Sequence, residues 1–168
     1  MRFLYIPPQK DYNISMLKIR VVAVGDVKES FYREAIAEYV KRLGRWAKTE
    51  ITEVSEASRA DSPDKKREEE GEEILRKLKG KTVLLDVKGK KISSEGIADL
   101  LRKSALAGDS ELTFVIGGSN GVSQAVKSAA DEMLSFGDIT LPHQLFRVVL
   151  LEQLYRGMAI IAGTPYHK

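Results

Sequence analysis

Hydrophobic and polar positions follow two different periods along the first half of the chain. Residues 17–25 (LKIRVVAVG) form a short apolar run rich in β-branched side chains, which predicts a buried strand. Residues 29–46 place apolar side chains at helical spacing, and Gly44 provides a stop signal, so we expect a helix there. Residues 49–54 (TEITEV) alternate as a half-buried strand does.

The alternation of strands and helices continues through the middle of the chain. Asp61, Ser62 and Pro63 lead into an expected helix that ends at Gly80, and its many charges indicate a solvated face rather than an acidic binding surface. Further on we expect strand 82–87, a glycine turn, helix 93–108, strand 112–117 and helix 124–134. Strands that are almost continuously apolar and flanked by helices predict an α/β domain with a mostly parallel sheet.

The last third breaks this pattern. Residues 134–144 (LSFGDITLPHQ) combine a short apolar stretch with a Gly-Asp turn, and a long helix is expected to follow up to residue 163. That helix is apolar around most of its circumference, with Leu145, Val148, Val149, Leu150, Leu151, Leu154 and Met158. One side can face the sheet and the other a second subunit, so we expect a homodimer.

Composition limits the remaining choices. A chain of 168 residues with 43% hydrophobic content suits one domain, here 16–168. Residues 1–15 form an N-terminal extension of unknown role, and either they are genuine or Met16 is the natural start. With no cysteine and two distant histidines, we expect neither disulfides nor a metal site. Residues 3–6 are too short an apolar run for a signal peptide or a membrane span, so we expect a cytoplasmic protein with no membrane partner.

Positive charge gathers near the C-terminus. The chain has 27 basic and 24 acidic residues, but Glu152 is the only carboxylate side chain between residues 139 and 168. The same segment contains His143, Arg147, Arg156, His167 and Lys168. These residues are candidates for binding phosphates. The alternative is that they are ordinary charged residues on a solvent-exposed helix face.

The glycines in residues 114–121 (FVIGGSNG) raise the question of whether this segment binds a nucleotide. They follow the fourth strand with the spacing G-G-x-x-G, and no G-x-x-x-x-G-K-[ST] phosphate loop occurs in the sequence. A phosphate cradle is therefore disfavoured. Glycines still let a ligand approach the main chain, and a tight turn between strand and helix is the alternative.

Four segments in this order, LLDVKGK, FVIGGSNG, LSFGDITLPHQLFRVVLLEQLYRG and PYHK, closely resemble the RlmH family of large-subunit ribosomal RNA methyltransferases. The resemblance runs from residue 16 to residue 168. It implies a SPOUT-type α/β knot, in which a mostly parallel sheet is flanked by helices and the C-terminal segment forms a trefoil knot. It also implies a homodimer that uses S-adenosyl-L-methionine to methylate N3 of a pseudouridine in 23S rRNA within the assembled ribosome. The alternatives are another RNA substrate, such as tRNA, and a non-catalytic ribosome-binding protein.

The resemblance also implies a cofactor site. Its residues here are Leu85, Gly117, Phe136, Gly137, Asp138, Ile139, Thr140 and Leu141. At Gly137 and Asp138 the chain departs from the family, which more often has a small hydroxyl residue followed by a variable one. If the family contact is made through the main chain, the change is tolerated; if it is made through a hydroxyl, the affinity for the cofactor suffers.

Catalysis requires the N3 proton of the pseudouridine to leave, and histidine, with an unperturbed pKa of about 6.5, suits that role at neutral pH. We expect the catalytic candidates His143, Arg147, Tyr166 and His167 to gather at the dimer interface, with Arg147, Arg156 and Lys168 contacting RNA. The alternatives are a helix cap for His143 and an i, i+4 salt bridge for Glu152 with Arg156. Without a separate RNA-binding module, recognition would depend on a preformed target shape.

Overall fold

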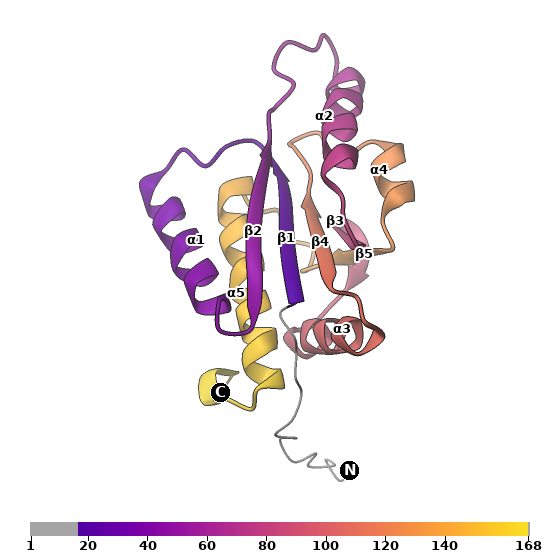
Figure 1. The fold of residues 1–168 in the computed structure, drawn as a ribbon. Coiled ribbons are helices and arrows are strands. Elements are labelled where there is room, and N and C mark those ends of the chain that lie inside the picture. The colour runs from indigo at the N-terminus through magenta and orange to yellow at the C-terminus, as the bar shows by residue number, and fades with distance from the viewer. Residues whose placement is uncertain (1–16, 168) are drawn as a thin grey trace.

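The computed structural model describes residues 17–167 (Figure 1). The expected N-terminal extension, Met16 and the RNA-contact candidate Lys168 lie outside the described residues. The side chain of His167 is also outside the description, although its backbone belongs to it.

A five-stranded sheet with the strand order β2-β1-β4-β3-β5 forms the centre of the fold. Every neighbouring pair of strands is parallel. The strands are β1 (Leu17–Val24), β2 (Ala47–Val54), β3 (Lys81–Lys91), β4 (Glu111–Ile116) and β5 (Glu132–Ser135). The α/β class with a parallel sheet is thus confirmed, whereas the trefoil knot and the domain limits remain predictions.

Helices cover both faces of the sheet, because alternate side chains of each strand point to opposite sides. In β1, Val21 packs into a core shared with α1, α3 and α5, whereas Val22 packs into a second core with α2 and α4. The helices are α1 (Ser30–Leu43), α2 (Pro63–Lys77), α3 (Ser94–Ala107), α4 (Gln124–Ala129) and α5 (His143–Ile161), followed by the short 3-10 helix η1 (Pro165–His167).

The expected helix 124–134 is wrong in its second half. The helix α4 ends at Ala129, and β5 starts at Glu132 and pairs with β3, so that Leu134 lies beside Leu85. Because Leu134 is buried in the first core, tertiary packing overrides the weak helical pattern of this short segment.

The expected glycine turn after residue 87 is instead an irregularity within β3. The pairing of β3 with β5 shifts between Leu85 and Lys90, and the chain then continues as strand to Lys91. A Cβ atom on Gly89 would lie 2.6 to 2.8 Å from backbone atoms of Leu134. Only glycine can approach the neighbouring strand this closely, so Gly89 permits the bulge formed by residues 86–89.

The charged helix α2 is mostly solvated, as expected, with one exception. Ser62 caps its start by accepting a hydrogen bond from the Lys65 N–H, and the helix stops at Lys77, before the predicted Gly80. Glu70 is the exception, because it is only 6% exposed and accepts a hydrogen bond from the Ala57 N–H at 3.1 Å. Glu70 helps to hold the loop between β2 and α2 and does not belong to the solvent-exposed face of the helix.

The long helix α5 packs against both α1 and α3 of its own chain. Its most buried residues include Leu150, Leu151, Leu154 and Met158, while Val148 and Val149 are half-buried. Neighbours in the same chain therefore cover part of the surface for which we expected a second subunit. No helix among residues 17–167 is long and apolar enough to cross a membrane.

Candidate functional site

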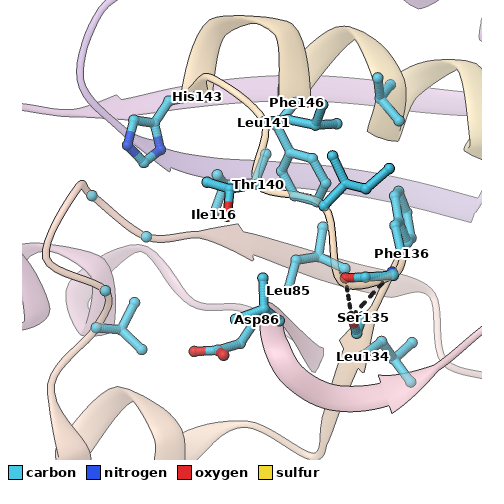
Figure 2. Close-up of a pocket in the computed structure, with 18 residues that line it drawn as sticks. Leu85, Asp86, Ile116, Leu134, Ser135, Phe136, Thr140, Leu141, His143 and Phe146 are labelled. Atoms are coloured by element: carbon cyan, nitrogen blue, oxygen red, sulfur yellow. Dashed lines mark hydrogen bonds between the residues drawn. The ribbon is translucent and has the colours of Figure 1, made fainter.

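A cavity of about 330 Å³ opens at the carboxyl ends of β3, β4 and β5, beside the start of α5 (Figure 2). Most of its wall is apolar. Side chains from all four elements contribute, including Leu85, Ile116, Leu134, Leu141, Phe146 and Val149. In parallel α/β sheets, ligands bind at this edge, where the loops after the strands leave a crevice.

The glycine loop after β4 forms one wall. Gly117, Gly118 and Gly121 all line the cavity, and the Gly121 N–H donates to the Gly118 carbonyl at 2.9 Å to close the turn. A Cβ atom on Gly117 would lie 2.6 Å from Cγ1 of Val122. Glycine at this position therefore keeps the loop close to Val122 and lets a ligand approach its main chain.

The loop after β5 forms the opposite wall. The Ser135 hydroxyl accepts a hydrogen bond from the Gly137 N–H at 3.1 Å and donates to the Gly137 carbonyl at 3.0 Å (Figure 2). Phe136 packs against Phe146 of α5, with ring centroids 5.4 Å apart. These contacts fix the loop against α5 and keep its main chain at the cavity.

The structure brings the expected cofactor residues together, apart from one side chain. The residues that line the cavity are Leu85, Gly117, Phe136, Gly137, Ile139, Thr140 and Leu141. Asp138 does not line it, because its exposed carboxylate forms an ion pair with Lys91 at 2.6 Å. Sequence reasoning did not select Asp86 or Ser135, although both line the cavity and directly adjoin the candidates Leu85 and Phe136.

The catalytic candidates are divided between the two ends of α5. His143 lines the cavity as the first residue of the helix; Pro142 is the N-cap and no side chain caps this end. Tyr166 and the backbone of His167 lie in η1, beyond the other end. A helix of 19 residues is about 28 Å long, so His143 and Tyr166 of one chain do not meet.

Arg147 is buried, contrary to the expected contact with RNA. Its side chain has 0% exposure, and its guanidinium donates to Glu53 Oε1 at 2.7 Å and to the carbonyls of Val24 and Gly25 at 2.9 and 2.6 Å. These bonds tie α5 to the carboxyl ends of β1 and β2. Arg147 thus has no free surface with which to hold a phosphate, and its hydrogen bonds hold α5 against the sheet.

Arg156 is bound within its own chain as well. It donates to Glu152 Oε1 through Nε at 2.9 Å and Nη2 at 2.7 Å, which is the i, i+4 salt bridge that we considered as the alternative. The Tyr166 hydroxyl donates to the same oxygen at 3.3 Å, and the Tyr166 ring packs on Arg156 and Tyr155. Burial, with contributions from Tyr39 and Glu152, raises the pKa of Tyr166 to about 12.

Comparison with known proteins gives a consistent result. The model of a family described as predicted SPOUT methyltransferases matches residues 17–167. The ribosomal RNA large subunit methyltransferase H of Lactobacillus acidophilus is 45% identical over 159 residues, covering 90% of this chain and 100% of the relative. The proteins of the same name from Clostridium botulinum and Limosilactobacillus reuteri are 46% and 47% identical with the same coverage.

Among solved structures, the SpoU methyltransferase AviRb from Streptomyces viridochromogenes, in complex with AdoMet, covers 86% of this chain and 61% of its own. It is 10% identical with a TM-score of 0.43, and we draw nothing about this chain from so distant a likeness. The family match and the full-length relatives show that the chain belongs to the SPOUT methyltransferases and, among them, to the family of ribosomal RNA large subunit methyltransferase H.

Proposed function

We propose that the chain uses S-adenosyl-L-methionine to methylate N3 of a pseudouridine in 23S rRNA within the assembled ribosome. The observation that carries this proposal is the identity of 45 to 47% to relatives named ribosomal RNA large subunit methyltransferase H, over their full length. For a ribosomal substrate we expect a cytoplasmic protein. The pseudouridine and its N3 atom come from the family resemblance.

The cavity suits adenosylmethionine in size and chemistry. Its volume of about 330 Å³ and its apolar wall of Leu85, Ile116 and Leu134 offer a place for the adenine ring. The main chain of the glycine loop and of residues 135–140 can meet polar groups of the ligand. Adenosylmethionine has no phosphate, which agrees with the lack of a phosphate loop in the sequence.

The chain's own residues would hold and orient the reactants. Bound adenosylmethionine supplies a methyl group on a positively charged sulfur, and positioning contributes most of the rate in such a displacement. His143 lies on the cavity wall, where a neutral imidazole can accept the N3 proton of the base. Arg147 acts indirectly. Its hydrogen bonds to the carbonyls of Val24 and Gly25 hold the start of α5, which carries His143.

The site becomes complete only with a second copy of the chain. His143 and Tyr166 lie at opposite ends of α5, so the expected cluster of these residues requires one of them from each subunit. Exposed apolar side chains lie at the rim of the cavity, with Val87 55% and Ile139 80% exposed. A homodimer in which the C-terminal turn of one copy covers the cavity of the other would join the cluster and bury this rim.

Exposed lysines next to the cavity can hold the RNA backbone. Lys88 and Lys90 lie on or beside the bulge in β3, immediately after the lining residues Asp86 and Val87. Among the described residues, neither lysine is in a salt bridge, so both remain available for phosphate oxygens. They take over the role that the sequence had suggested for the buried Arg147.

Methyl transfer from labelled adenosylmethionine tests this function directly. Assembled ribosomes, free 23S rRNA and tRNA would be compared as substrates, with the modified nucleoside identified by mass spectrometry. We expect label on N3 of pseudouridine from ribosomes alone. Label on tRNA would overturn the substrate but keep the methyltransferase, and cofactor binding without any label on the three RNAs would contradict the proposed reaction.

A further inference from the structure

Among residues 17–167, the cavity wall contains a single carboxylate, that of Asp86. The residue follows Leu85 at the point where β3 leaves its regular pairing with β5. Figure 2 shows Asp86 and His143 toward one side of the cavity, with Ser135 and Phe136 toward the other. The otherwise mostly apolar cavity therefore has a negatively charged group at one place in its wall.

The structure holds this carboxylate in place. The Lys88 N–H donates to Asp86 Oδ1 at 2.9 Å, and Gly89 packs against the backbone of Leu134. No salt bridge to Asp86 occurs among residues 17–167, so its charge is not neutralised by a neighbouring side chain. Asp138, on the other side of the same rim, differs in this respect because Lys91 neutralises it.

We propose that Asp86 makes the cavity select adenosylmethionine over adenosylhomocysteine, the by-product that remains after the methyl group has left. This inference rests on the proposed function. The two molecules share the adenine, ribose and amino-acid parts, so apolar walls and main-chain contacts bind them alike. They differ in one methyl group and in the positive charge on sulfur, and a nearby negative group distinguishes this charge.

A preference for adenosylmethionine over adenosylhomocysteine would speed the release of the by-product after each reaction. Transfer of the methyl group removes the positive charge from sulfur, and the attraction to Asp86 disappears at the same moment. The by-product is then held by the shared contacts alone and leaves more readily, which limits inhibition by product. The attraction depends on the charge on sulfur and on the distance to the carboxylate, so it acts on adenosylmethionine and not on the by-product.

Binding calorimetry with both ligands tests the inference without measuring activity. We expect Asp86→Asn to lower the affinity for adenosylmethionine roughly tenfold and that for adenosylhomocysteine less than about twofold, because only the charged ligand loses an attraction. Asp86→Glu, which keeps the charge, should retain the preference. Asp99→Asn is the matched control, because Asp99 is an exposed carboxylate on α3 paired with Arg102, and it should change neither affinity.

Each outcome has a distinct meaning. An equal loss of both ligands in Asp86→Asn would overturn the inference and indicate that Asp86 binds a shared group, such as the ribose hydroxyls, or only supports the bulge. Unchanged binding of both ligands would also overturn it. If the unmodified protein bound neither ligand, the proposed function and the inference would fail together, whereas selective binding without methyl transfer to RNA would contradict only the proposed function.

Discussion

The two ends of α5 are held in opposite ways. At the first end Arg147 is fully buried and donates to Glu53 and to two backbone carbonyls of the β1 end, beside the cavity. Toward the last end Glu152, Arg156 and Tyr166 form a partly exposed cluster, with the Arg156 and Glu152 side chains 28% and 18% exposed. A buried arginine with backbone acceptors is rigid, whereas a partly exposed ion pair holds its partners less firmly.

The two ends of α5 therefore have different expected roles. The first end fixes His143 and the cavity wall to the sheet, so its loss should affect folding. The last end presents η1 without a buried anchor of comparable strength, so its loss should affect methyl transfer more than stability. The same helix would thus supply a fixed half-site to its own subunit and an adjustable half-site to the partner.

Arg147→Leu should have the largest effect. It leaves the carbonyls of Val24 and Gly25 without their donor, and we expect a loss of about 3 kcal/mol in the free energy of unfolding. The matched control Arg156→Leu removes a partly exposed arginine of the same helix and should cost less than about 1 kcal/mol. Urea titration measures both, and equal small losses would contradict the anchoring role of Arg147.

Glu152→Ala should separate activity from stability. It removes the oxygen that accepts from both Arg156 and Tyr166, and we expect methyl transfer to fall roughly tenfold because η1 is no longer positioned. The affinity for adenosylmethionine should change little. Glu72→Ala is a matched control, since Glu72 forms an i, i+4 pair with Arg76 on α2, away from η1. A fall in activity as large in the control would refute the positioning of η1 by Glu152.

The pH dependence of stability should show a smaller effect of Tyr166. Burial, followed by Tyr39 and Glu152, raises its pKa from 10.0 to about 12, so the folded state favours the neutral phenol. This contribution is complete below pH 10 and is lost as the pH rises from about 10 to about 12. Tyr166→Phe should reduce the decline of stability above pH 10 in chemical denaturation; an unchanged decline would mean that another group causes it.

Asp138→Ala should have the smallest effect. The Asp138 carboxylate pairs with exposed Lys91 and does not line the cavity, so we expect the affinity for adenosylmethionine to change less than about twofold. This measurement tests only the Asp138 position of the Gly-Asp departure, because the hydroxyl residue of the family corresponds to Gly137. A tenfold loss of affinity would show that the side chain, rather than the main chain, contacts the cofactor.

Most of the fold was predictable from local patterns, and its errors have physical causes. Periodicity located β1, α1 and α5, because their side chains pack at the spacing of their own secondary structure. It failed at β5, whose four residues are too few to show a period and take their strand conformation from pairing with β3. Long-range pairing of this kind is not encoded in the local pattern.

The candidate site shows the same limit for charged residues. The family resemblance located the cavity wall, but the sequence suggested a surface role for Arg147. Its hydrogen-bond acceptors at Val24 and Gly25 lie more than 100 residues earlier in the chain, and nothing in the helix sequence reveals that they meet. Glu70 differs from its exposed neighbours on α2 for a similar reason, since its partner is the main chain of Ala57.

Subunit complementation tests the central claim, that one site is assembled from the two ends of α5 in different copies. Gly117→Val should disrupt the cavity wall, because a Cβ atom at this position would lie 2.6 Å from Cγ1 of Val122 and force the glycine loop to shift. Tyr166→Ala should remove the partner's contribution. Each variant alone should be inactive. A purified heterodimer of the two has one complete site and should regain roughly half of the wild-type methyl transfer to ribosomes. A heterodimer without activity, or full activity of Tyr166→Ala alone, would contradict the shared site.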